Sequence, residues 1–160
     1  MRTSARLSLL VAAISGMVLI GVAFAQSNAF VGTWKLNVAK SKYSNGTPPQ
    51  SSTTRIEPAG AGVKYVVDQV TATGEKQHWE FTCMYDGKDN PVTGANPNGD
   101  TVALTRVNAT TVRQVNKLHG KPTVTQVAVV SAGGKTRTLT TTGTTPLGQV
   151  VNNVTVYDRQ

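Results

Sequence analysis

Apolar and polar residues alternate along most of the chain with a period of two, which is typical of half-buried β-strands. The clearest case is residues 76–85, in which one face carries Trp79, Phe81, Cys83 and Tyr85. Similar alternation predicts nine strands: 31–38, 52–57, 63–72, 76–85, 101–107, 111–118, 122–131, 135–142 and 149–158. Thr and Val are frequent, and both favour strands because branching at Cβ stiffens the side chain.

Short connections rich in Gly, Asn and Pro separate most of these predicted strands. Such turns join antiparallel neighbours, and closing the resulting meander removes its two exposed edges. A sandwich needs longer crossing connections, for which only residues 39–50 and 86–100 are candidates. We therefore expect an all-β fold, a single antiparallel up-and-down β-barrel of about 8–10 strands, with a sandwich as the alternative. Residues 39–50 have room for one short helical turn, and residues 86–100 are expected to be irregular.

The N-terminus has the pattern of an export signal. Arg2 and Arg6 precede an apolar run over residues 7–22, and small residues occupy the two positions in Ala23-Phe24-Ala25 that a signal peptidase reads. An uncleaved anchor is the alternative, but the run is short for a spanning helix, which needs about 20 apolar residues. We expect a signal peptide over residues 1–25 and a secreted or periplasmic domain over residues 26–160, not held at a membrane.

The charge of the chain is basic but dispersed. The chain has sixteen Lys and Arg residues and eight Asp and Glu residues, which gives a formal net charge of +8. They are scattered singly, whereas a nucleic-acid-binding face would cluster basic residues and interleave aromatic ones. We expect no nucleic-acid partner and a monomer, with a weak preference for anionic ligands left open. The single cysteine, Cys83, cannot form an internal disulfide and is expected to be a small buried hydrophobe.

No catalytic or metal-binding arrangement can be read from the chain. His78 falls on the outer face of its strand and His119 lies in a turn, and a histidine without a placed partner makes no proton relay. Asp86, Asp89 and Asn90 crowd one loop and could offer oxygens to calcium, although turn formation explains the same residues. We expect no enzymatic activity, no cofactor and no metal ion, with calcium in this loop as the alternative.

The pair Gly32-x-Trp34 resembles the lipocalin signature, and residues 30–36 are similar to the opening of the intracellular fatty-acid-binding proteins. Both families belong to the calycin group of small barrels that hold apolar ligands, and the nearest likeness is to small secreted lipocalin-like proteins of bacteria. The resemblance implies an interior cavity, with Gly32 and Trp34 at one sealed end. The chain departs from fatty-acid-binding proteins in two ways. Residues 39–50 leave no room for a helical lid, and Thr155 stands where an Arg-x-Tyr carboxylate clamp ending at Tyr157 would need arginine.

Inward faces can be chosen by keeping lone charges outside and the aromatic face of residues 76–85 inside. The candidate ligand-binding residues are Tyr65, Trp79, Phe81, Arg106, Gln114 and Arg137. Apolar walls with a few placed polar groups are typical of ligand sites, and Arg106 or Arg137 would meet an acidic head. We expect a binding protein for a small apolar or amphipathic ligand. The alternative is a side-chain-filled barrel that serves as an interaction module at the cell envelope. The inward faces of residues 122–131 and 149–158 stay open.

Overall fold

The computed structural model describes residues 28–160, which form strands and no helix. The eleven strands are β1 (Gly32–Lys42), β2 (Ser51–Ala59), β3 (Gly62–Val70), β4 (Lys76–Cys83), β5 (Asp86–Pro91), β6 (Thr93–Gly94), β7 (Thr101–Asn108), β8 (Thr111–Leu118), β9 (Lys121–Val130), β10 (Thr136–Thr144) and β11 (Val150–Arg159). In this part of the chain there is accordingly no helix long and apolar enough to cross a membrane. The predicted signal peptide lies outside the described residues and stays a prediction.

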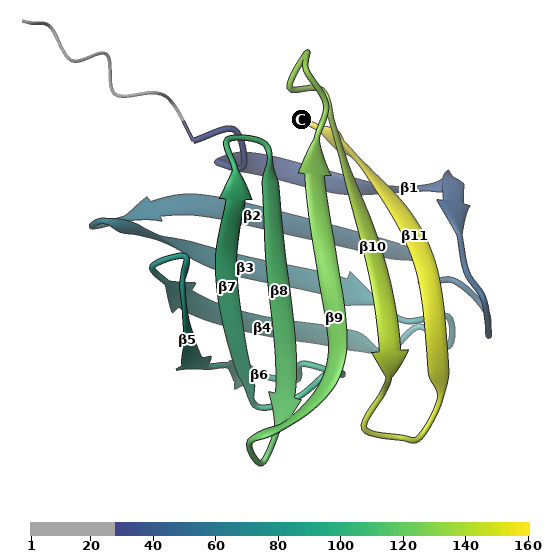
Figure 1. The fold of residues 1–160 in the computed structure, drawn as a ribbon. Coiled ribbons are helices and arrows are strands. Elements are labelled where there is room, and N and C mark those ends of the chain that lie inside the picture. The colour runs from purple at the N-terminus through teal and green to yellow at the C-terminus, as the bar shows by residue number, and fades with distance from the viewer. Residues whose placement is uncertain (1–27) are drawn as a thin grey trace, which may run out of the picture.

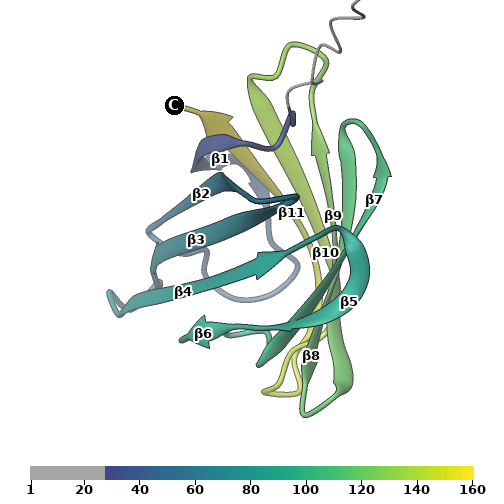
Figure 2. The same cartoon turned by 90° about the vertical axis from the view of Figure 1, so that its left-hand side faces the viewer.

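All eleven strands belong to one antiparallel sheet that curls into a nearly closed barrel. Its order is β5-β7-β8-β9-β10-β11-β1-β2-β3-β4-β6, so neighbours in sequence are neighbours in space around most of the sheet. Strands β1–β4 run across the view of Figure 1, and β7–β11 pass in front of them as a second, steeply crossing layer. Figure 2 shows the same two layers from the side. The all-β, up-and-down barrel expected from the alternation is thus confirmed.

The barrel closes through residues 86–94, for which the prediction of irregular structure was wrong, whereas residues 95–100 are irregular as expected. β5 pairs with β7 at one edge of the sheet, β6 pairs with β4 at the other, and Val92 alone separates β5 from β6. This bent run carries the chain from one layer to the other (Figure 2). Its sequence, rich in Asp, Asn and Gly, shows no alternation and lies mostly exposed. Pairing with β7 imposes the extended conformation there, because strand formation depends more on neighbours than on intrinsic preference.

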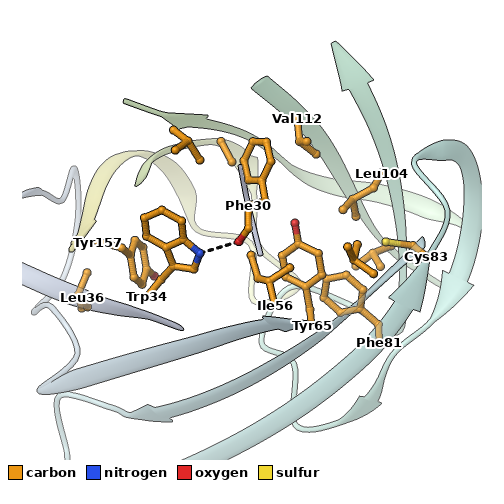
Figure 3. Packing of buried hydrophobic residues seen from close by; sticks show 14 residues of the cluster. Phe30, Trp34, Leu36, Ile56, Tyr65, Phe81, Cys83, Leu104, Val112 and Tyr157 are labelled. Atoms are coloured by element: carbon orange, nitrogen blue, oxygen red, sulfur yellow. Dashed lines mark hydrogen bonds between the residues drawn. The ribbon is translucent and has the colours of Figure 1, made fainter. Parts of the chain in front are cut away.

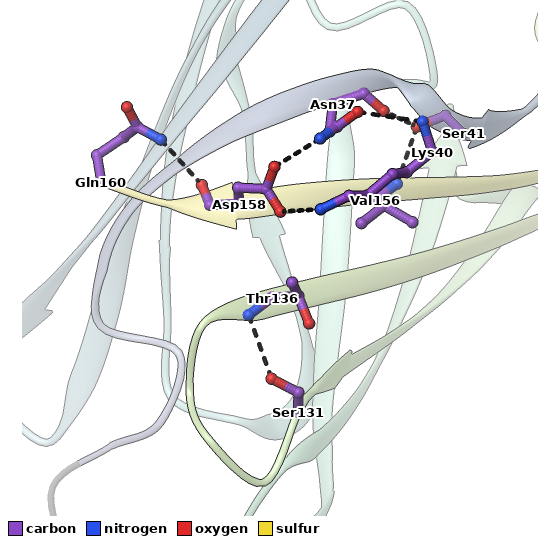
Figure 4. Close-up of polar contacts among 8 residues, drawn as sticks. All are labelled: Asn37, Lys40, Ser41, Ser131, Thr136, Val156, Asp158 and Gln160. Atoms are coloured by element: carbon purple, nitrogen blue, oxygen red, sulfur yellow. Dashed lines mark hydrogen bonds and ion pairs between the residues drawn. The ribbon is translucent and has the colours of Figure 1, made fainter.

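Strand β1 continues to Lys42, over residues where the sequence allowed a helical turn, and bends on the way. Its register with β11 shifts after Asn37, which marks an irregularity of the bulge type. The Ser41 hydroxyl donates to the Asn37 carbonyl at 2.7 Å and accepts from the Val156 amide at 3.0 Å. The Asn37 amide donates to Asp158 at 2.6 Å (Figure 4). Side chains therefore replace the backbone pairing that is lost where β1 turns from one layer to the other.

The hydrophobic core fills the half of the barrel near the start of β1. Its buried members are Phe30, Trp34, Leu36, Ile56, Val63, Tyr65, Phe81, Cys83, Val102, Leu104, Val112, Ala128, Val130 and Tyr157. Trp34 is fully buried, and its indole N–H donates to the Phe30 carbonyl at 2.8 Å (Figure 3). A buried indole N–H without a partner would be costly. The hydrogen bond from Trp34 therefore holds the turn at Phe30 in place ahead of β1.

Arg159 seals this end of the barrel from outside the core. Its guanidinium carbon lies 4.2 Å from the centroid of the Trp34 ring. Its three nitrogens donate, each at 2.6 Å, to the carbonyls of Gly134, Val31 and Ala29. Gly32 has φ +136°, and a Cβ at this position would meet the Arg159 guanidinium. Glycine is therefore required at position 32 both for the backbone and for the space that the arginine occupies.

Candidate functional site

A cavity of about 120 Å³ lies inside the barrel, on the side of the core away from Arg159. It is lined by Ser52, Thr54, Tyr65, Val67, Gln69, Trp79, Phe81, Asn96, Pro97, Asn98, Val112, Gln114, Asn116, Gln126, Ala128, Arg137, Leu139 and Tyr157. A second space of about 200 Å³ adjoins it and shares Gln69, Asn98, Gln126, Leu139 and Tyr157 with it. The interior is therefore filled by side chains in one half and hollow in the other. An engineered cavity of about 150 Å³ holds benzene, so the inner space matches a small group.

Five of the six candidate ligand-binding residues line this cavity: Tyr65, Trp79, Phe81, Gln114 and Arg137. The strand register explains why they meet. Tyr65 pairs across β3 and β4 with Phe81, and two residues along Val67 pairs with Trp79. The rings of Tyr65 and Phe81 stack with centroids 4.8 Å apart and planes 11° apart (Figure 3). These residues thus form one aromatic wall, and their contact with a ligand stays a prediction.

Arg106 is not among the lining residues. Its guanidinium lies over the Tyr85 ring, 4.2 Å from the centroid. It borders a separate surface depression beside Asn28, Ala29 and the turn after β7. Arg106 pairs with Val112 in the same register as Leu104 with Gln114, so it keeps the inner face that alternation predicted. It does not line the cavity because it lies nearer the end of β7, where its guanidinium packs on Tyr85.

Arg137 is the charged group of the cavity. Its side chain is 4 % exposed, and its guanidinium carbon lies 4.6 Å from the Tyr157 ring centroid and 5.6 Å from that of Trp34. Its Nη2 donates to the Thr54 hydroxyl at 3.2 Å, while its Nε has no hydrogen-bond partner among the described residues. Burial lowers the pKa of Arg137, yet arginine stays protonated in proteins. Among the described residues, no Asp or Glu lines the cavity, so no carboxylate there compensates the positive charge.

The arginine and a tyrosine are brought together across two strands. Arg137 on β10 stands directly opposite Tyr157 on β11. The sequence comparison within β11 found only Thr155 at the position where a clamp arginine would stand, and it missed this cross-strand pair. No pattern within a single strand could have revealed this pair, because the pairing register of β10 and β11 cannot be deduced from either strand's sequence alone. The guanidinium of Arg137 makes a cation–π contact with the face of the Tyr157 ring. Such a contact contributes about 2 kcal/mol when it is desolvated.

A chain of side-chain amides crosses the wall formed by β8, β9 and β10. Gln114 donates to Asn116 at 3.2 Å, Asn116 to Gln126 at 3.3 Å, and Gln126 to the Thr141 hydroxyl at 3.4 Å. Asn116 is 1 % exposed, and a buried amide is tolerated only when it is hydrogen-bonded. Alternation placed Gln114 inside but left the inward face of residues 122–131 open, so the role of Gln126 was missed.

The loop after β6 forms part of the cavity wall through Asn96, Pro97 and Asn98. Its backbone is tied to the strands at both ends. The Ala95 amide donates to the His78 carbonyl at 2.8 Å, and the Thr123 hydroxyl donates to the Asn98 carbonyl at 2.5 Å. Residues 95–100 belong to the stretch that was expected to be irregular, and no ligand-binding role was predicted for them. The asparagines of this loop now belong to the polar lining.

The other reactive side chains lie elsewhere. His78 pairs with Asp68 at 2.7 Å on the exposed outer surface. Cys83 is buried, and desolvation raises the pKa of its thiol to about 11, which disfavours the nucleophilic thiolate. Asp89 pairs with Lys117 at 2.7 Å. Within residues 28–160 no group of three or more His, Cys, Asp or Glu side chains is placed to hold a metal ion.

No protein-family model matches this chain, and no curated protein matches it. Among solved structures, the chain is similar to the zebrafish ileal bile acid-binding protein, crystallised with cholic acid. The two share 14 % sequence identity over 82 % of this chain and 99 % of the other, with a TM-score of 0.47. At this identity and TM-score the similarity does not identify a ligand for this chain, so its function has to be derived from the cavity.

Proposed function

We propose that the barrel binds a small amphipathic molecule in its interior, with Arg137 meeting an acidic head. Tyr65, Trp79 and Phe81 would pack against the apolar part of the ligand. The observation that carries this proposal is the buried guanidinium of Arg137, whose Nε has no partner and whose cavity contains no carboxylate within residues 28–160.

The energetics favour an anion at this place. Moving a charged side chain out of water costs several kcal/mol even after relaxation. The single hydrogen bond to Thr54 and the stacking on Tyr157 offset only part of this cost. A carboxylate in the cavity would add charge-assisted hydrogen bonds, which are about twice as strong as neutral ones. An acidic ligand would thus offset part of the cost of burying the Arg137 guanidinium.

We also propose that the domain acts as a secreted or periplasmic binding protein without enzymatic activity. Support comes from the basic and apolar pattern of residues 1–25 and from the inert, buried thiol of Cys83. Expression of the full chain in a bacterial host, followed by N-terminal sequencing of the exported fraction, tests this. A protein that begins at Gln26 is expected, and a product that keeps its apolar run in the membrane fraction would contradict it.

Octanoate and octanol form a matched pair of probes for the binding site, since they differ in the charged head. We expect octanoate to bind at least about tenfold more tightly than octanol, as measured by calorimetry, because one charge-assisted hydrogen bond is worth about 1.5–3 kcal/mol. Substitution Arg137→Met should abolish the difference. Arg106→Met is the control and should preserve it, because Arg106 lies outside the cavity.

Two results would count against the proposal. Equal affinity for octanoate and octanol would remove Arg137 from ligand recognition. Failure of both probes, together with no small molecule copurifying in native mass spectrometry, would favour the interaction-module alternative.

A further inference from the structure

Much of the cavity lining is too polar for a plain hydrocarbon tail. Six amide side chains contribute to it: Gln69, Asn96, Asn98, Gln114, Asn116 and Gln126. A methylene chain packed against these amides would strip them of water without replacing their hydrogen bonds, which costs about 1–3 kcal/mol for each group left unpaired. The ligand therefore has to offer hydrogen bonds at a second place, apart from the head that meets Arg137.

The amide chain of Gln114, Asn116 and Gln126 is the part of the wall with spare hydrogen-bonding capacity. Gln114 uses its Nε2 within the chain, which leaves its Oε1 able to accept from a ligand. The Gln126 amide reaches Thr141 at only 3.4 Å, a long bond that a better-placed partner could replace. This wall can thus both accept and donate to one polar group of a ligand.

Strand geometry sets the separation between this polar group and Arg137. Arg137 and Thr141 stand on the same face of β10, four residues apart, which corresponds to about 13 Å between their backbones. Thr141 pairs with Gln126, and Gln126 pairs with Gln114, so the amides lie in the row of Thr141. The side chains of Arg137 and Gln126 reach into this interval. The inner space of about 120 Å³ and the adjoining space of about 200 Å³, which includes Thr141 and Gln126, together have room for one ring and its two substituents.

We propose that the ligand is a compact ring-bearing organic acid with a hydroxyl or amide group on the side away from its carboxylate. The carboxylate lies at Arg137, the ring packs against the stacked pair Tyr65 and Phe81, and the second polar group bonds with Gln114 and Gln126. Aromatic side chains favour flat partners, which they contact by offset stacking or edge-to-face packing. This assignment rests on the proposed function above and narrows it to a short, doubly polar acid.

The test compares para-hydroxybenzoate, benzoate and octanoate by calorimetry on the purified protein. Para-hydroxybenzoate is expected to bind about tenfold more tightly than benzoate, the ratio that one well-made hydrogen bond supplies. Gln114→Leu should reduce that ratio to about one, because it removes the hydrogen bond that only para-hydroxybenzoate makes. Gln149→Leu, a change at an exposed glutamine of the β10–β11 loop, is the matched control and should keep the ratio. Gln126→Leu repeats the test if the first variant melts below the assay temperature.

The outcomes separate this assignment from the general function. If octanoate binds as tightly as para-hydroxybenzoate or more so, the ring-and-hydroxyl assignment is wrong, while binding of an amphipathic acid at Arg137 stands. A preference for para-hydroxybenzoate that survives both glutamine substitutions overturns the role of the amide wall. If none of the three acids binds, both the assignment and the proposed function fail.

Discussion

Replacing Arg137 by methionine should make the ligand-free protein more stable and abolish recognition of acids. The substitution loses a hydrogen bond from a charged donor to Thr54, worth about 1.5 kcal/mol. It also loses the cation–π contact with Tyr157, worth about 2 kcal/mol in a desolvated site. Against this, it removes the desolvation penalty of a buried, unpaired guanidinium, which we take as about 5 kcal/mol. A net stabilisation of about 1–2 kcal/mol is expected.

Thermal unfolding followed by circular dichroism measures this difference. For a domain of this length, each kcal/mol raises Tm by about 3–5 °C, so Arg137→Met should melt about 3–10 °C above the parent protein. Both proteins have to be refolded from denaturant first, because a copurified ligand would stabilise the parent by mass action. Arg106→Met provides the control, since its guanidinium is half-buried and lies on Tyr85 away from the cavity.

A lower Tm for Arg137→Met would refute this reasoning. It would mean that the aromatic neighbours and Thr54 stabilise the guanidinium by more than its burial costs, so that Arg137 serves the fold. Unchanged octanoate affinity in the same variant would lead to the same conclusion from the binding side.

Three further predictions concern the loop, the thiol and an exposed carboxylate. Gly99→Ala should weaken octanoate binding severalfold and lower Tm, because a Cβ there would overlap the Lys117 carbonyl; Gly120→Ala, also at positive φ but with open space around it, should lower Tm without affecting binding. Cys83 should resist iodoacetamide at pH 8 until the protein unfolds, since burial raises its pKa to about 11, and rapid labelling of the folded protein would contradict its burial. Hydrogen bonds from Asn37 and Lys40 lower the pKa of Asp158 from 3.8. Its carboxylate therefore contributes stability above pH 3.8, and this stability is lost as the pH falls through the folded pKa. Asp158→Asn should flatten that part of the acid unfolding curve.

Strand positions and many inward faces could be predicted from the sequence because alternation and lone charges are local signals. The predicted strand over residues 111–118 coincides with β8. Lys64 and Asp68 excluded one face of β3, and the opposite face indeed supplies Tyr65 and Val67 to the cavity. β5 and β6 could not be predicted, because their extended conformation comes from pairing with β7 and β4 and not from residue preference.

The sequence predicted which residues of a single strand point into the candidate site, but not the contacts between residues of different strands. Gln114 was found because the other members of its face are apolar or amide, and Arg137 was found because it shares a face with Leu139. The pairing of Arg137 with Tyr157, and the lock that Arg159 forms across Trp34, depend on register and on closure of the barrel. Arg106 keeps the inner face that alternation predicted, but its position near the end of β7, over Tyr85 and away from the cavity, depends on how the barrel is assembled.

Two arginines with different roles contact the ring of Trp34. Arg159 and Arg137 both lie against its ring, at 4.2 Å and 5.6 Å from the centroid. Arg159 donates to three backbone carbonyls at the barrel end, so its hydrogen-bonding capacity is used by the fold. Arg137 makes one hydrogen bond to protein in the described part of the chain and keeps its Nε unpaired beside a cavity. Because a buried donor left unpaired costs stability, and functional sites are where proteins tolerate such costs, Arg137 is the arginine that a ligand would complete.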